Sequence, residues 1–319
     1  MSDAAHKATD KALEELEARV KRVYGRSNQE LKRKLQNYLE DVQKGREKQE
    51  ALLKAGKITQ TEFNDWVTRK TAMGKRWEEL AQNVADDLEN SNKIARKMAD
   101  GTRADVYALN HNFAVYQCEH DGRCSTVYQL YDRHTVERLM KEDRKLMPPP
   151  GKQVKEARAR QMAAKWNNQN LQSALTQSIL QGESIPEMAV RISHTVVTKN
   201  YSRSVMYART MVTGAENAGR QDGYKEAEDM GIELEKEWVA TLDDRTRHSH
   251  RMLHGEHVPV DEPYSNGCMF PGDPDGDPSE IYNCRCTQKA RINGFDRARV
   301  ESSPKMGDLS FEEWQEMKG

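Results

Sequence analysis

The stretch IELEKEWVATL, residues 232–242, marks a change of periodicity along the chain. Before it, apolar residues recur every three or four positions, as they do on one face of a helix. Within it, apolar side chains alternate with mostly charged ones, which is typical of a half-buried strand. The alternating apolar residues are Ile232, Leu234, Trp238, Ala240 and Leu242. We therefore expect a mainly α-helical region of long helices that ends in a small α+β module.

Two further strands are expected after this one. The segments EHVPV (256–260) and CRCTQKARI (284–292) have strand character, and a loop rich in Pro, Gly and Asp separates them. Together with residues 232–242 they predict a short antiparallel sheet.

Helix boundaries are predicted from glycines and capping boxes. A helix with Leu13, Leu16, Val20 and Val23 on one face should end at Gly25. The sequence SNQE at 27–30 then predicts the start of a second helix, and TQTE at 59–62 the start of a third. In the helix expected at 200–230, three glycines would let another backbone approach closely; they are Gly214, Gly219 and Gly223.

Composition suits long amphipathic helices better than one compact core, because 32% of the 319 residues are charged and 36% are hydrophobic. The prolines of KLMPPPGK (145–152) interrupt any helix. The predicted division is a helical domain at 1–147, a Pro-rich linker at 148–152, a helical stalk at 153–231, an α+β Cys/His module at 232–294 and a tail at 295–319.

Charge and hydropathy exclude several classes of protein. With 50 Lys and Arg against 51 Asp and Glu, the formal charge is -1, so bulk electrostatics does not favour nucleic-acid binding. No stretch approaches the roughly 20 apolar residues of a membrane span. Charges also occupy the N-terminal positions where a signal peptide has its apolar core. We expect a soluble protein in a reducing compartment, with no membrane and no small-molecule substrate as partner.

The tail offers one more capping box in SFEEWQEM, residues 310–317. Phe311, Trp314 and Met317 lie on one face of the helix that it predicts. These three residues are candidates for binding a partner, and the alternative is that the helix folds back on its own chain.

A constellation of His, Asp and Cys residues follows the first strand. If the segment after Asp244 is helical, His250 and His254 share a face and present two imidazoles to one metal ion. With Cys284 and Cys286 they would complete a tetrahedral site for structural zinc. Further candidates for the fourth ligand are Cys268, Asp243 and His248.

Other readings of the cysteines stay open. A redox pair usually has two residues between its thiols rather than one. Cys118, His120 and Cys124 form at most half of a zinc site, and a hairpin with two free thiols is the better interpretation. A metal ion beside Asp244 or Glu256 would suit a hydrolase. No phosphate loop, HExxH motif or nucleophile elbow is present, so we predict that the protein is not an enzyme.

The segments YARTMVTGAENAGRQDGYKEAEDMG, KEWVATLDDRTRHSHRMLHGEHVPVDEPY, PGDP and NCRCT resemble the head morphogenesis domain of tailed-phage minor head proteins, the Mu F-like family. The resemblance covers roughly residues 160–292. AGKITQTEF, LYDRHTVERL, LMPPPGK and WNNQNLQSALTQSILQGESIP are similar to the N-terminal halves of such proteins.

The resemblance implies a minor capsid protein that binds the phage portal and assists procapsid assembly and DNA packaging or ejection. It implies a virion location, at the capsid interior or portal vertex, after assembly in the bacterial host cytoplasm. Further partners would be the major capsid or scaffolding protein and packaged DNA. His250, Cys284 and Cys286 match the family's His and Cys positions, but Ile281 and Tyr282 replace its usual His-Pro. The alternative function is a metal-dependent hydrolase, a nuclease or a toxin-like effector.

Overall fold

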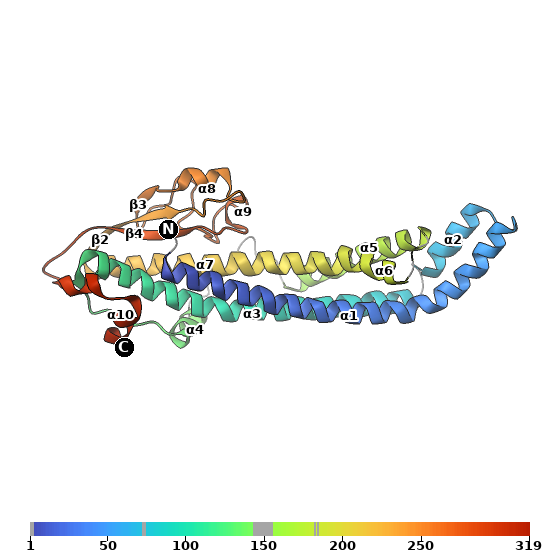
Figure 1. Cartoon of the computed structure of the whole chain (residues 1–319), viewed down its shortest axis with the longest axis horizontal. Coiled ribbons are helices and arrows are strands. Elements are labelled where there is room, and N and C mark those ends of the chain that lie inside the picture. Colours follow the sequence, from blue (N-terminus) through green and yellow to red (C-terminus); the bar gives the residue numbers. More distant parts are fainter. Residues whose placement is uncertain (1–2, 72–74, 143–155, 182, 184) are drawn as a thin grey trace. The chain divides into compact units, whose positions relative to one another are not determined.

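The protein is described here from a computed structural model that covers residues 3–71, 75–142, 156–181, 183 and 185–319. It divides into two compact units, whose elements are labelled in Figure 1. Unit 1 comprises residues 1–17, 97–153 and 206–319, and unit 2 comprises residues 18–96 and 154–205. The predicted Pro-rich linker lies outside the described residues. None of the described helices has the length and apolar character needed to cross a bilayer.

The long helices are α1 (Ala4–Lys54), α3 (Lys75–Gly122) and α7 (Thr198–Met230). The break predicted at Gly25 is wrong, because α1 continues through it. Ser27, expected to cap a new helix, instead donates from Oγ to the carbonyl of Val23 at 3.3 Å. A glycine costs a helix about 1 kcal/mol, and the buried apolar series on either side of it outweighs that cost; its members include Leu16, Val20, Leu31 and Leu35.

Unit 2 also contains α2 (Gln60–Thr71), α5 (Glu156–Leu180), α6 (Ile185–Ile192) and a π-helical turn at Ser193–Val197. The capping box predicted at the start of α2 is confirmed. The Glu62 amide donates to Thr59 Oγ1 at 3.2 Å, and the Thr59 amide donates back to the Glu62 carboxylate at 2.8 Å.

Unit 1 contains the predicted antiparallel sheet, which is confirmed with the order β3-β2-β4. The strands are β2 (Ile232–Val239), β3 (His257–Pro259) and β4 (Thr287–Phe295). Ile232, Leu234 and Trp238 are buried as the alternation predicts, and Lys236 is buried in the same series. Its Nζ donates to the carbonyls of Val260 and Met269, both at 2.8 Å, so this inward lysine is satisfied.

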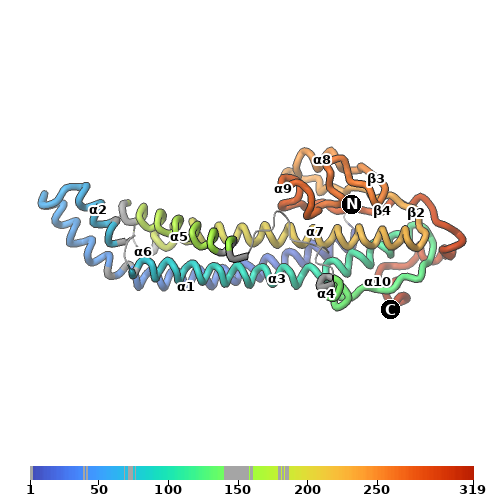
Figure 2. Tube along the Cα trace, turned by 180° about the vertical axis from the view of Figure 1, so that it is seen from behind, coloured from blue at the N-terminus to red at the C-terminus, as the bar shows by residue number. Residues whose placement is uncertain are grey.

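The sheet lies along the C-terminal part of α7 (Figures 1 and 2). On another side, α7 packs closely against α3, as its glycines predict. A Cβ at Gly219 would lie 2.5 Å from the carbonyl oxygen of Tyr107, and one at Gly223 would lie 2.7 Å from that of His111. Any side chain at these positions would push the two helices apart.

A second, two-stranded sheet joins distant parts of the chain. β1 (Cys124–Ser125) pairs with β5 (Glu301–Ser302), and α4 (Arg133–Glu142) follows β1. The local hairpin expected around Cys124 is therefore wrong, because its partner strand comes from the tail. Cys118 and Cys124 are both free and buried.

The tail folds back onto its own chain through α10 (Phe311–Lys318), which follows a 3-10 turn at Pro304–Asp308. The capping box of Ser310 and Glu313 is confirmed. Phe311 and Trp314 are buried within their own chain, which is the alternative that the sequence left open, and Met317 is 51% exposed. Trp314 Nε1 and Lys318 Nζ donate to the buried Glu119 carboxylate at 2.6 and 2.8 Å, and this charge holds α10 against α3.

The N-terminal residues pair with a buried charge on α7. The Arg220 guanidinium is fully buried and donates to both oxygens of Asp3, at 2.7 and 2.8 Å. It also donates to Asn110 Oδ1 at 3.0 Å and to the Gln288 carbonyl at 2.9 Å. One side chain of α7 thus joins the residue before α1 to α3 and β4.

We expect Asp3→Ala to destabilise the protein by about 2 to 3 kcal/mol, because it removes the carboxylate that is hydrogen-bonded to the buried Arg220 and leaves only Glu216, at 3.8 Å, as its counter-ion. This loss of stability lies at the low end of the range for a buried ion pair, because the side chain of Asp3 is itself 25% exposed. Chemical denaturation would measure it, with Glu15→Ala on the exposed face of α1 as the matched control. Equal stability of the two variants would contradict this role for Asp3.

Candidate metal centre

His250 lies on the short helix α8 (His248–Leu253), where it is buried. The loop before α8 is held by Asp243, whose carboxylate accepts two hydrogen bonds of 2.6 Å from Arg285. These bonds hold the pKa of Asp243 well below its usual value. Arg251 Nη2 donates to the Asp243 carbonyl at 2.6 Å. The loop and the helix are thereby fixed to the segment that carries the two cysteines.

Cys284 and Cys286 lie between α9 (Pro278–Ile281) and β4, not within a strand as expected. Asn283 turns the chain with a positive φ of 54°. Two side chains of α7 then fix the backbone of the cysteines. Thr213 Oγ1 donates to the Cys284 carbonyl at 2.9 Å, and Asn217 Nδ2 donates to the Cys286 carbonyl at 3.1 Å.

The structure brings His250, Cys284 and Cys286 together. Their ligand atoms all lie within 4.8 Å of one another, and all three residues are buried. His250 Nδ1 is 3.3 Å from Cys286 Sγ and 3.7 Å from Cys284 Sγ. Tetrahedral zinc with ordinary bond lengths separates a nitrogen and a sulfur ligand by about 3.6 Å. The donor set and its spacing therefore fit zinc.

Glu280, on α9, lies beside the other nitrogen of the same imidazole. Its carboxylate oxygen is 3.0 Å from His250 Nε2, although the angle is not that of a hydrogen bond. A carboxylate on the second nitrogen commonly fixes the tautomer and orientation of a metal-binding histidine. Glu280 was not predicted as a site residue, and the only signal for it in the sequence is a carboxylate four residues before Cys284.

The two thiols differ in acidity. The Cys284 thiol donates a hydrogen bond to the sulfur of Cys286, which lowers the pKa of Cys286 below its ordinary value. The neighbouring His250 also lowers this pKa, although burial acts in the opposite direction. The pKa of Cys284 lies well above its ordinary value because its thiol proton is hydrogen-bonded to Cys286 and because Cys284 is buried. The pair therefore supplies one thiolate readily, and thiolate is the form that binds metal ions.

The candidates for a fourth ligand lie elsewhere. His254 caps the end of α8, and its Nδ1 accepts a hydrogen bond from the Ala240 amide at 3.2 Å. Asp243 is bound to Arg285, and His248 is exposed. Cys268 is buried in the same hydrophobic cluster but is not among the grouped ligands. Among the described residues, the group thus has three members.

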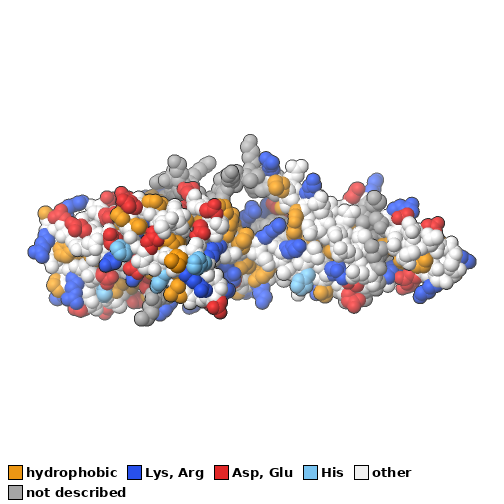
Figure 3. Space-filling view, turned by 90° about the horizontal axis from the view of Figure 1, so that it is seen from above, with side chains coloured by type: hydrophobic (Ala, Val, Ile, Leu, Met, Phe, Trp, Pro, Cys, Tyr) orange, Lys and Arg blue, Asp and Glu red, His pale blue; other side chains and the backbone are white. Residues whose placement is uncertain are grey.

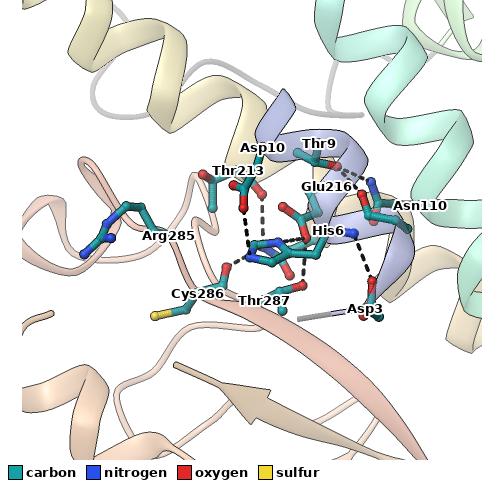
Figure 4. Close-up of polar contacts among 12 residues, drawn as sticks. Asp3, His6, Thr9, Asp10, Asn110, Thr213, Glu216, Arg285, Cys286 and Thr287 are labelled. Carbon is teal, nitrogen blue, oxygen red and sulfur yellow. Dashed lines mark hydrogen bonds and ion pairs between the residues drawn. The ribbon is translucent and has the colours of Figure 1, made fainter. Parts of the chain in front are cut away.

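A polar network supports the strand that follows Cys286 (Figure 4). Glu216 of α7 is almost fully buried, and its Oε1 accepts from Thr287 Oγ1 at 2.8 Å. The same oxygen lies 2.7 Å from His6 Nδ1. Asp10 is near the other nitrogen of His6, at 3.9 Å. The first turns of α1 therefore take part in holding the Cys-containing segment.

Comparison with known proteins agrees with this arrangement. Residues 169–289, which include all three grouped ligands, match the family model described as phage Mu protein F like protein. The chain is also 22% identical to the minor head protein GP7 of Bacillus phage SPP1 over 322 residues, covering 98% of this chain and 96% of that protein.

The chain is thus similar to a phage minor head protein over almost its whole length, and its residues 169–289 match the Mu F-like family model.

Part of the chain is also similar to an enzyme. It is 31% identical over 156 residues to the NAD(+)–arginine ADP-ribosyltransferase EFV of Enterococcus faecalis (strain ATCC 700802 / V583). The match covers 46% of this chain. This chain spans 31% of that relative's length, about a third. No solved structure matches the chain.

We expect the contribution of the His6–Glu216 pair to stability to fall as pH rises. Burial lowers the pKa of His6, but the hydrogen bond and charge of Glu216 outweigh it and raise that pKa above its ordinary value. The pair's contribution is complete below the unfolded pKa of about 6.5 and is lost as pH rises through the folded pKa. The free energy of unfolding of the wild type and of His6→Gln, measured from acid to mildly alkaline pH, should converge. A difference that stays constant with pH would contradict the expectation.

Proposed function

We propose that this protein is a minor capsid protein of a tailed phage or prophage, located in the virion at the capsid interior or portal vertex. It binds the portal and assists procapsid assembly and DNA packaging or ejection. The observation that carries the proposal is the similarity to a phage minor head protein over 98% of the chain. Further partners are the major capsid or scaffolding protein and packaged DNA.

We also propose that His250, Cys284 and Cys286 hold a structural zinc ion. Bound zinc would crosslink α8 to the segment before β4 without supplying a reaction. The burial of all three residues supports this role, since a catalytic site keeps one coordination position open to water or substrate. Glu280 would position the imidazole of His250, and Thr213 and Asn217 would hold the two cysteines.

Metal analysis of purified wild-type and variant chains tests the zinc proposal. We expect one equivalent of zinc in the wild type and none in Cys286→Ser, with a melting temperature lowered by several degrees. Cys268→Ser is the matched control, because it removes a buried thiol of the same core and should keep its zinc. Glu280→Gln should weaken zinc binding about 10- to 100-fold. A wild-type protein without zinc after expression in zinc-supplemented medium would overturn the proposal.

The alternative is an enzyme or toxin-like effector, for which the similarity to EFV is the specific observation. That similarity covers under a third of the transferase, so we propose a non-enzymatic role. An assay of labelled ADP-ribose transfer from NAD⁺ to arginine-containing protein, run beside a nuclease assay, separates the two. Activity that survives purification would favour the alternative.

Binding to the portal is the direct test of the proposed role. We expect the full-length chain to co-elute in size-exclusion chromatography with the portal protein of the same phage. An unrelated phage's portal serves as the control. Failure to co-elute at micromolar concentrations would overturn the role as a portal-bound protein.

A further inference from the structure

The carboxylates of the chain are absent from two stretches of unit 2. Residues 157–182 and 188–205 contain no Asp or Glu, although 51 of the 319 residues of the chain are acidic. An even distribution would place about seven carboxylates in stretches of this combined length. The same stretches contain these basic residues: Arg158, Arg160, Lys165, Arg191, Lys199 and Arg203. The net charge of -1 therefore conceals a local excess of positive charge. Figure 3 shows red acidic side chains clustered at the end that carries the α+β module, and fewer of them towards the middle of the view.

The two stretches meet where α5 packs against the first turns of α7. Asn200 Nδ2 donates to Asn167 Oδ1 at 2.9 Å, and both side chains are buried. Beside this contact, the Arg203 guanidinium lies over the ring of Trp166, 4.3 Å from its centroid, and Lys199 Nζ is 5.7 Å from the same centroid. The half-buried tryptophan of α5 thus holds two cations of α7 next to the basic residues of its own helix.

Four of the basic side chains are exposed, and within the described part of the chain none of them forms an ion pair: Arg158, Lys165, Lys199 and Arg203. Arg191, by contrast, is paired with Glu183. On α3, Asp86 and Glu89 line a cavity of about 360 Å³ with other residues of α5, and neither Trp166 nor any of the four cations lines that cavity. The four cations are therefore available to an external anion.

Uncharged hydrogen-bonding side chains accompany these cations on the exposed positions of the two helices: Asn168, Gln169, Ser173 and Ser202. Amide and hydroxyl groups together with Lys and Arg are the side chains that contact phosphate and sugar. A protein partner would instead need an apolar centre to the interface. The large apolar side chains exposed in the described parts of these stretches, Met162 and Val190, lie on different helices. This composition favours a nucleic-acid backbone over an acidic protein.

The spacing of the cations suits a DNA strand. Arg158 and Lys165 are two helical turns apart on α5, so they share a face and are separated by about 10 Å along the axis. Successive phosphates of one strand advance about 3.4 Å along the duplex, so this separation corresponds to about three phosphates. Lys199 and Arg203 add a second pair on α7, about 6 Å apart along its axis.

We infer that Arg158, Lys165, Lys199 and Arg203 form a binding surface for the sugar–phosphate backbone of duplex DNA. Trp166 positions the two cations of α7, and contacts of this kind carry no base-sequence preference. The inference rests on the proposed function, which includes packaged DNA among the partners, and it assigns that contact to α5 and α7 of unit 2.

Fluorescence anisotropy of a labelled 20-base-pair duplex with the full-length chain tests the surface. Four phosphate contacts predict that the logarithm of the association constant falls with the logarithm of the salt concentration with a slope of about -3.6. Lys199→Gln with Arg203→Gln should raise the Kd at least tenfold at about 50 mM salt and reduce the slope to about -1.8. Arg158→Gln with Lys165→Gln should have the same effect, because both pairs contribute to one surface.

Arg22→Gln with Arg26→Gln is the matched control. Both residues are exposed on α1 of unit 2, four positions apart like the α7 pair, and their replacement changes the net charge by the same amount. This variant should bind the duplex as the wild type does. Melting curves should be unchanged in all variants, because each replaced side chain is exposed.

The possible outcomes separate this inference from the proposed function. If the wild type binds portal but not the duplex, the DNA surface is wrong and the role as a portal-bound protein stands. If the duplex binds through these residues and portal does not bind, the surface stands and the portal-bound role falls. Duplex binding that keeps its affinity and salt slope in both double variants would overturn the inference. Displacement of the duplex by poly-glutamate at equal concentration of charge would also overturn it, in favour of an acidic protein.

Discussion

Two charged side chains of α7, Arg220 and Glu216, are buried almost completely, and the organisation of unit 1 depends on their partners. A buried charge without a partner costs several kcal/mol, so α7 is stable in this position only when counter-charges reach it. The two charges lie 3.8 Å from each other, and further counter-charges come from Asp3 and His6. β4 supplies hydrogen-bonding groups through Thr287 and Gln288. The N-terminal turns of α1 are therefore part of the core of a region whose family match begins only at residue 169.

The same helix links this network to the cysteines. Thr213 and Asn217 hold the backbone of Cys284 and Cys286, and Glu216 lies between them in sequence. Consecutive turns of α7 thus fix both the candidate metal ligands and the strand that follows them. The cluster is enclosed by Trp238, Leu253 and Tyr264, so its ligand atoms are buried within the hydrophobic core of the module.

The sequence predictions that the structure confirms rest on local signals. The alternation from Ile232 to Trp238 and the capping boxes at Thr59 and Ser310 act within a few residues, so neighbouring sequence is sufficient to predict them. The grouping of His250 with the cysteines followed from the residue types and from the resemblance to a known family.

The sequence predictions that are wrong, and the residues that were not predicted, concern contacts between segments that are distant in the sequence. The burial of Leu16 to Leu35 carries α1 through Gly25, and β1 pairs with a strand almost 180 residues away. The Glu119 charge that draws in α10, and the place of Glu280 beside His250, depend equally on tertiary packing. No spacing in the sequence encodes such pairs, because their geometry exists only once the elements have assembled.

The three separate segments of unit 1 have a consequence for synthesis. Residues 3–9 are synthesised well before their partners at 216–220 and 287–288, which are made more than 200 residues later. At about 5–20 residues per second, the N-terminal turn waits roughly 10 to 60 seconds for its counter-charges. Unit 1 therefore completes its fold only after translation of most of the chain.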